Sequence, residues 1–148
     1  MAPAELDRVC KRKTFAGTKV YVENFEGNYL SMKKKLYYAN RFQQCSNPQM
    51  QPVFAYSMVE GQGNKWRLSL VTDRHYDKLN ELWNSVWFHS FKMKIEVFIQ
   101  IGKALMALHR NRESYGDLKD TNVIINAERQ ILLSCIIDKN IPPHVLVI

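Results

Sequence analysis

The sequence has no long hydrophobic run, and this absence excludes a membrane-spanning helix. Hydrophobic residues make up 46% of the 148 residues. They are nevertheless interrupted well before the roughly 18 consecutive residues that cross a bilayer. The first residues also lack the basic and then apolar segments of a secretory signal peptide. With 24% charged residues, the composition is that of a soluble globular protein. We therefore expect one soluble domain with no membrane partner.

Cysteine and histidine are scarce and widely spaced. The three cysteines are an odd number, and neither they nor the four histidines have the spacing of metal ligands. This excludes a disulfide framework as the main support of the fold and gives no reason to expect a metal. The simplest interpretation is reduced thiols in a cytoplasmic protein. The residues are Cys10, Cys45, Cys135, His75, His89, His109 and His144.

Acidic residues are missing from a long part of the chain, since no Asp or Glu occurs between Gly27 and Val59. The net charge is +7, which could indicate a nucleic-acid partner or an anionic surface. The positive charge is gathered in short clusters, Lys11–Lys13 and Lys33–Lys35, and does not form a stripe along a helix. We expect solvated surface at these clusters, with a basic nucleic-acid-binding module as an alternative.

Hydrophobic spacing and turn residues predict both strands and helices. Apolar residues alternate in the predicted strands and recur at three and four residues in the predicted helices. Strands are predicted at 19–25, 52–59, 66–72, 123–125 and 131–133, and helices at 30–44, 76–83 and 93–109. The fold class is therefore α+β.

One segment of eight residues carries the chemistry of the chain, Tyr115-Gly116-Asp117-Leu118-Lys119-Asp120-Thr121-Asn122. It resembles the catalytic loop of protein kinases, in which an Asp is followed by a Lys two residues later and an Asn five residues later. The resemblance implies that Asp117 would accept the proton of the attacking hydroxyl. Lys119 would neutralise charge on the transferred phosphoryl group, and Asn122 would hold a metal ion.

The order of the predicted elements extends this resemblance to residues 18–138. The resemblance implies a protein-kinase-like fold with a partial N-lobe at 18–72, made of a mixed or antiparallel sheet and one helix. Residues 73–138 would hold the hinge, the helices and the catalytic-type loop of a truncated helical C-lobe. Residues 1–17 would be an N-terminal extension and residues 139–148 an apolar tail.

Two further segments resemble parts of kinases. Leu70–His75 is similar to the hinge, which implies nucleotide contacts at Thr72, Asp73 and His75. The Tyr115-Gly116 pair and the Ser46-Asn47-Pro48 break are most similar to the tyrosine-kinase-like branch. That branch contains the receptor-interacting kinases and the mixed-lineage-kinase-like pseudokinase.

Against this resemblance, several positions carry the wrong residue for catalysis. Glu23 stands where a strand Lys would hold the phosphates, and Tyr38 stands where a helix Glu would orient that Lys. Gly116 replaces the usual Arg, and Cys135 replaces the Asp that binds Mg²⁺, a metal that prefers oxygen ligands. Only Gly17 precedes Glu23, so a glycine-rich loop is not expected.

These degenerate positions predict a catalytically inactive pseudokinase with no ATP, Mg²⁺ or other cofactor. In that case Asp117 and Asn122 would tie the loop together through side-chain hydrogen bonds. The protein would act by docking on a cellular protein kinase or another signalling protein, inhibiting or sequestering it as viral or regulatory kinase mimics do. The first alternative is a divergent active serine/threonine-type kinase that uses Asp117, Lys119, Asn122 and Asp138. The apolar tail could instead pair with a second copy, which would make a homodimer.

Overall fold

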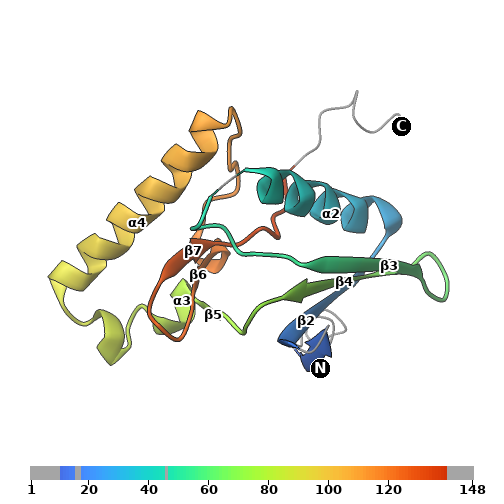
Figure 1. Ribbon diagram of the computed structural model, residues 1–148, viewed down its shortest axis with the longest axis horizontal. Helices are drawn as coiled ribbons and strands as arrows, with labels where there is room; N and C mark the ends of the chain where they lie inside the picture. Colours follow the sequence, from blue (N-terminus) through green and yellow to red (C-terminus); the bar gives the residue numbers. More distant parts are fainter. Residues whose placement is uncertain (1–10, 16–17, 46, 140–148) are drawn as a thin grey trace.

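The first sheet is formed by four antiparallel strands in the order β1-β2-β4-β3 (Figure 1). This computed structural model describes residues 11–15, 18–45 and 47–139. The strands are β1 (Lys11–Phe15), β2 (Thr18–Gly27), β3 (Ala55–Glu60) and β4 (Trp66–Thr72). β4 lies in the centre, where Leu68 and Leu70 are fully buried. β2, β4 and the β3–β4 hairpin confirm the predicted strands.

Strand β1 lies within the segment that was predicted to be an N-terminal extension. Lys11–Phe15 pairs with β2 in antiparallel register, from Lys11 opposite Val22 to Phe15 opposite Thr18. This strand was not predicted from the sequence. Its Lys-Arg-Lys-Thr-Phe sequence has no apolar alternation, so the strand depends on pairing with β2 and not on its own propensity. Residues 1–10 and 16–17 lie outside the described part.

Helix α2 (Tyr29–Gln44) confirms the predicted helix and covers one face of this sheet (Figure 1). The side chain of Asn28 caps its first turn, since the backbone N–H of Ser31 donates to Asn28 Oδ1 at 2.8 Å. Its buried side carries Met32, Tyr38, Ala39 and Phe42. This helix therefore packs its buried side against β2 and β4 and closes the core on that face. The break after it was predicted at Ser46-Asn47-Pro48, of which Ser46 lies outside the described residues.

The second sheet has three strands in the order β5-β6-β7. They are β5 (Asp77–Lys78), β6 (Val123–Ile125) and β7 (Ile131–Leu133), and the last two confirm the predicted hairpin. The predicted helix at 76–83 is wrong in its first part, because Asp77 and Lys78 pair with Ile125 and Ile124. Only Leu79–Leu82 is helical, as α3. Pairing with the edge of β6 overrides the helix-like spacing of this segment.

The long helix α4 (Phe91–Arg110) confirms the predicted helix and packs against β7. Ser90 caps it, with its Oγ accepting from the backbone N–H of Met93 at 3.2 Å. Two short 3₁₀ turns, η1 (Val86–Phe88) and η2 (Asp120–Asn122), complete the second half. Within the described residues, no helix is both long and apolar enough to span a membrane.

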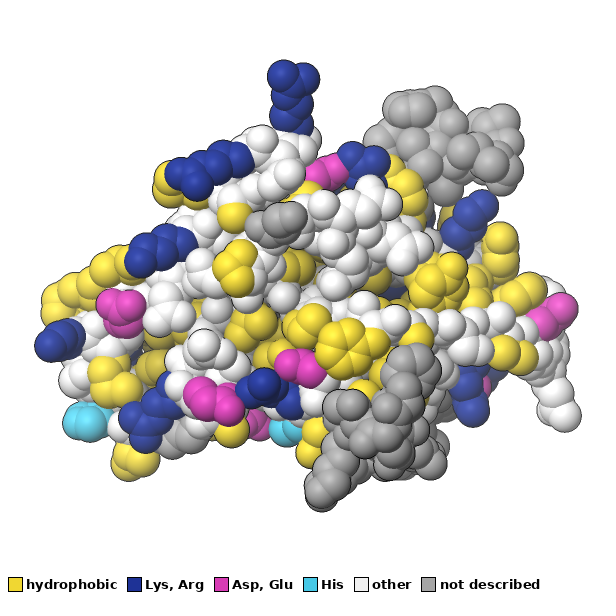
Figure 2. Space-filling model, viewed as in Figure 1, with side chains coloured by type: hydrophobic (Ala, Val, Ile, Leu, Met, Phe, Trp, Pro, Cys, Tyr) yellow, Lys and Arg dark blue, Asp and Glu magenta, His cyan; other side chains and the backbone are white. Residues whose placement is uncertain are grey.

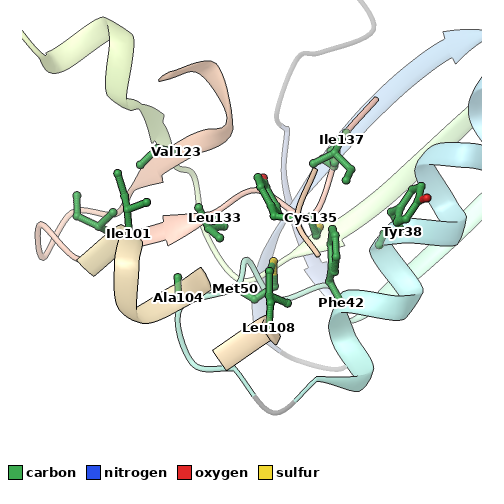
Figure 3. Close-up of a cluster of buried hydrophobic side chains, with 14 of the residues drawn as sticks. Tyr38, Phe42, Met50, Ile101, Ala104, Leu108, Val123, Leu133, Cys135 and Ile137 are labelled. Atoms are coloured by element: carbon green, nitrogen blue, oxygen red, sulfur yellow. The ribbon is translucent and has the colours of Figure 1, made fainter. Parts of the chain in front are cut away.

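The segment before β3 ties the two sheets together. The strand predicted at 52–59 begins only at Ala55, and the chain just before residue 52 bonds to the second sheet. Gln51 N–H donates to the carbonyl of Leu133 at 2.9 Å, and Leu133 N–H donates to that of Gln49 at 2.8 Å. The main core has contributions from both halves (Figure 3), and Tyr76, Ile124 and Leu132 form a smaller second cluster. The labelled side chains of the main core come from α2 (Tyr38, Phe42), α4 (Ile101, Ala104, Leu108), β6 (Val123), β7 (Leu133) and the segments at Met50, Cys135 and Ile137.

Candidate functional site

The loop between α4 and β6 is anchored by two residues at its start. Tyr115 is buried, and its hydroxyl donates to the carbonyl of Ser134 at 2.6 Å. Burial raises the pKa of this hydroxyl, so it stays a donor. Gly116 has a φ of +76°, and a Cβ there would lie 2.7 Å from Lys139 Cδ. Glycine therefore suits the positive φ of this position, whereas the flexible Lys139 side chain does not by itself exclude a Cβ.

The carboxylate of Asp117 is held by its own chain. Asp117 Oδ2 accepts from Asn122 Nδ2 at 2.9 Å and from the backbone N–H of Asp138 at 3.0 Å. Asn122 Nδ2 also donates to the carbonyl of Asp117 at 2.8 Å. Lys119 Nζ lies 3.8 Å from Asp117 Oδ1. The loop thus brings together its three predicted functional residues, and their polar groups face one another.

A cleft of about 330 Å³ lies between the two sheets. Three of the predicted site residues line it, Glu23 from β2, His75 from the segment after β4, and Asn122 from η2. Glu81 and Lys78 also line it, so its carboxylates outnumber its single Lys. His75 contacts Asp77 through an ion pair of 3.3 Å when protonated. Such a lining favours a neutral or cationic group over a polyphosphate.

The other two hinge-like residues lie apart from this cleft. Thr72 is fully buried, and its hydroxyl donates to the carbonyl of Arg74. Asp73 pairs with Arg74 at 3.0 Å, accepts from the Tyr76 hydroxyl at 2.7 Å, and lines a separate hollow of about 290 Å³. Burial, followed by the hydrogen bond to Asp73, raises the pKa of Tyr76. Asp73 therefore stabilises the bend between the sheets.

Cys135 is fully buried and faces Gln51, with its Sγ 3.5 Å from Gln51 Oε1. Burial raises the pKa of the thiol strongly, and the nearby charge of Glu23 raises it further. The thiol is thus neutral and inaccessible, whereas a cysteine that binds a metal does so as an accessible thiolate. Among the described residues, no group of three or more His, Cys, Asp or Glu side chains is placed to hold a metal ion.

Tyr38 lies in the core, edge-on to Tyr37 and tilted against Phe42. Burial raises the pKa of its hydroxyl. Lys139 Nζ lies 5.3 Å from the centre of its ring. The position predicted to lack a helix Glu is therefore occupied by an aromatic packing residue.

Two ion pairs from α2 were not predicted. Lys35 Nζ lies 2.6 Å from Asp138 Oδ1, and Arg41 pairs with Glu113. Both cations belong to the helix, and both carboxylates come from the second half of the chain. The sequence did contain a signal for them, because a helix rich in Lys and Arg without any acid must find its carboxylates elsewhere.

Gln51 is the other residue that sequence reasoning missed. Its side chain is buried and lies against Ser134 and Cys135, while its backbone bonds to β7. A single Gln between two loop-like residues gives no periodic signal.

No protein-family model matches the sequence, and a comparison with curated proteins finds no match either.

Proposed function

We propose that the chain is a kinase-like protein that does not transfer phosphate and acts by binding a cellular protein kinase. The support for a kinase-like fold is the order of the elements. A small sheet with one covering helix is followed by a bend, a long helix, a loop with Asp, Lys and Asn at kinase spacing, and a short hairpin. A cytoplasmic location belongs to the proposal and agrees with the free, buried thiols of Cys45 and Cys135.

The observation that carries the proposal is the arrangement around Asp117. Phosphoryl transfer requires a carboxylate directed at the attacking hydroxyl and an Asn directed at the metal. Here the Asn122 amide and the backbone of Asp138 both donate to Asp117 Oδ2. These groups satisfy one another, which is a structural role for both residues.

The charge of the cleft supports the same conclusion. Glu23 lies in its wall, where the kinase resemblance places a Lys that would attract phosphates. In a partly enclosed site a carboxylate repels a polyphosphate more strongly than it would in water. Catalysis of this kind depends on neutralising charge, so a reversed charge removes a main contribution to the rate.

A titration of active kinases tests the proposal. Purified kinase domains of the tyrosine-kinase-like branch, including receptor-interacting kinases, are assayed with increasing amounts of the full chain. The expected result is a saturable fall in phosphorylation of a peptide substrate by at least one of them. An Asp117→Asn variant, which keeps an oxygen acceptor for Asn122 and Asp138 but loses the carboxylate base, should inhibit as well as the wild type, because the chain's own loop performs no chemistry. Inhibition of no kinase, with no binding in biolayer interferometry, would contradict the proposal.

A further inference from the structure

Helix α4 has a second apolar face besides the one that packs into the core. The buried face carries Val97, Ile101, Ala104 and Leu108. The other face is exposed, with Phe91 at 78% and Phe98 at 63% of their full accessibility. Ile95, Ile99 and Met106 are also exposed, and spacings of three, four and seven residues place all five on one side of the helix. Figure 2 shows hydrophobic side chains on the flank where α4 lies, with Lys and Arg between them.

This exposed face borders a groove of about 440 Å³ between α3, α4 and the catalytic-type loop. Phe98 and Trp83 line it, with their rings 5.9 Å apart at an interplanar angle of 75°. Leu118, 51% exposed, lines it from the loop. The same loop thus directs Asp117 inward to its own chain and presents Leu118 to the groove.

The exposed apolar area is large for a surface without a partner. Taking about 200 Å² for each large side chain, the five residues of α4 and Leu118 together expose roughly 650 Å². The largest apolar patch of a typical monomer is about 300–600 Å², and one side of a stable interface covers about 800 Å². The face and its rim therefore have the size of a specific protein interface.

The α4 side of this face is basic, whereas the loop side of the groove carries one residue of each charge, Lys119 and Asp120. α4 carries Lys92, Lys94, Lys103 and Arg110 against one acidic residue, Glu96. Lys94 Nζ lies 5.0 Å from the centre of the Trp83 ring, at the edge of the groove. A partner that covers the apolar stripe must bring its own flanks close to these cations, so acidic flanks are favoured.

We infer that the exposed face of α4, together with the Trp83–Phe98–Leu118 groove, binds an acidic amphipathic helix of a partner protein. The twenty residues of α4 give it a length of about 30 Å. A partner helix can pack along this length with its side-chain ridges in the grooves of α4. A second copy is disfavoured, because two such helices would bring Lys and Arg side chains against each other. A lipid surface is disfavoured because part of this surface, the groove lined by Trp83, Phe98 and Leu118, is concave.

This inference rests on the proposed function for the expectation that the chain binds a protein, and it adds the surface and the chemistry of the partner. The two can fail separately. If the Phe91→Ser/Phe98→Ser variant inhibits a kinase as well as the wild type, the kinase binds elsewhere and only the inference fails. If an acidic helix binds this face but no kinase is inhibited, only the proposed function fails.

The test uses the full chain and a synthetic helical peptide with Leu on one face and Glu on its flanks, followed by fluorescence anisotropy. The expected result is saturable binding that weakens about tenfold or more in the Phe91→Ser/Phe98→Ser variant. A Tyr56→Ser variant removes an exposed aromatic side chain from β3 and should bind as the wild type does. Circular dichroism of each variant establishes that the fold is kept.

Besides undiminished kinase inhibition by the double variant, four outcomes would overturn the inference. The first is no binding of the acidic peptide, and the second is equal binding of a matched peptide with Lys on its flanks. The third is a concentration-dependent dimer in light scattering that the double variant dissolves, since a second copy would then occupy the face. The fourth is sedimentation with phosphatidylcholine–phosphatidylserine vesicles that the double variant abolishes, which would identify a membrane surface instead.

Discussion

Replacing Asp117 by Ala should destabilise the protein, because its carboxylate holds the loop together. The change removes the acceptor of two hydrogen bonds, from Asn122 Nδ2 at 2.9 Å and from the backbone N–H of Asp138 at 3.0 Å. A hydrogen bond to a charged group contributes about 1.5–3 kcal/mol. The Asn122 amide keeps the carbonyl of Asp117 as a partner at 2.8 Å, and the Asp117 side chain is 18% exposed, which lowers the total. We expect a loss of about 2–3 kcal/mol in the free energy of unfolding.

Urea denaturation followed by tryptophan fluorescence measures this loss, with an unchanged slope against urea. Asp120→Ala is the matched control, because it removes an exposed carboxylate from the same loop. We expect that control to stay within about 0.5 kcal/mol of the wild type. Active-site residues are often held at some cost to stability, so their replacement can be neutral or stabilising. A stability of Asp117→Ala equal to or above that of the wild type would refute the structural role.

Three further predictions concern the core, the thiol and an ion pair. Leu108→Ala removes a fully buried side chain and should cost about 2–5 kcal/mol, whereas Met106→Ala, 53% exposed on the same helix, should cost under about 0.5 kcal/mol in the same assay. Burial raises the pKa of Cys135 above its ordinary 9.0, so the folded state keeps a proton that the unfolded chain loses above that pH. The stability due to the neutral thiol is therefore complete below pH 9.0 and is lost as the pH rises further. In alkaline denaturation, the free energy of unfolding of Cys135→Ala should fall less steeply with pH than that of the wild type. An equally steep fall in both proteins would exclude this cause. Lys35→Met breaks the ion pair with Asp138, which is 70% exposed, and should lower the free energy of unfolding by about 0.5–1 kcal/mol at low salt. This loss should be smaller at about 1 M salt, because salt screens the pair. A loss that does not depend on salt would argue against the ion pair.

The sequence predicted those elements whose own residues carry a strong period. Helix α4 and helix α2 have apolar residues at three and four positions, and the β6–β7 hairpin has two apolar triplets around a polar turn. β1 and β5 could not be predicted, since a run of basic residues and the dipeptide Asp77-Lys78 become strands only by pairing with a neighbour. Tertiary pairing of this kind leaves no local pattern.

The site was predictable where residues act within one short segment. The spacing of Asp117 and Asn122 was enough to expect their mutual hydrogen bonds. Contacts between distant segments were not predictable, such as Lys35 with Asp138, which are 103 residues apart. The burial of Gln51 against Cys135 belongs to the same class. The charge pattern of α2 predicts that the helix has acidic partners, but which carboxylates these are depends on the tertiary fold.

The central claim is that the catalytic-type loop holds itself together and performs no phosphate transfer. The most direct measurement of this claim is phosphate release from ATP and Mg²⁺ by the purified full chain, compared with Lys119→Ala and read beside thermal unfolding with and without the nucleotide. We predict no shift of the melting temperature by Mg²⁺-ATP and the same background rate in both proteins. A clear upward shift together with phosphate release that Lys119→Ala abolishes would contradict it and would establish a divergent kinase.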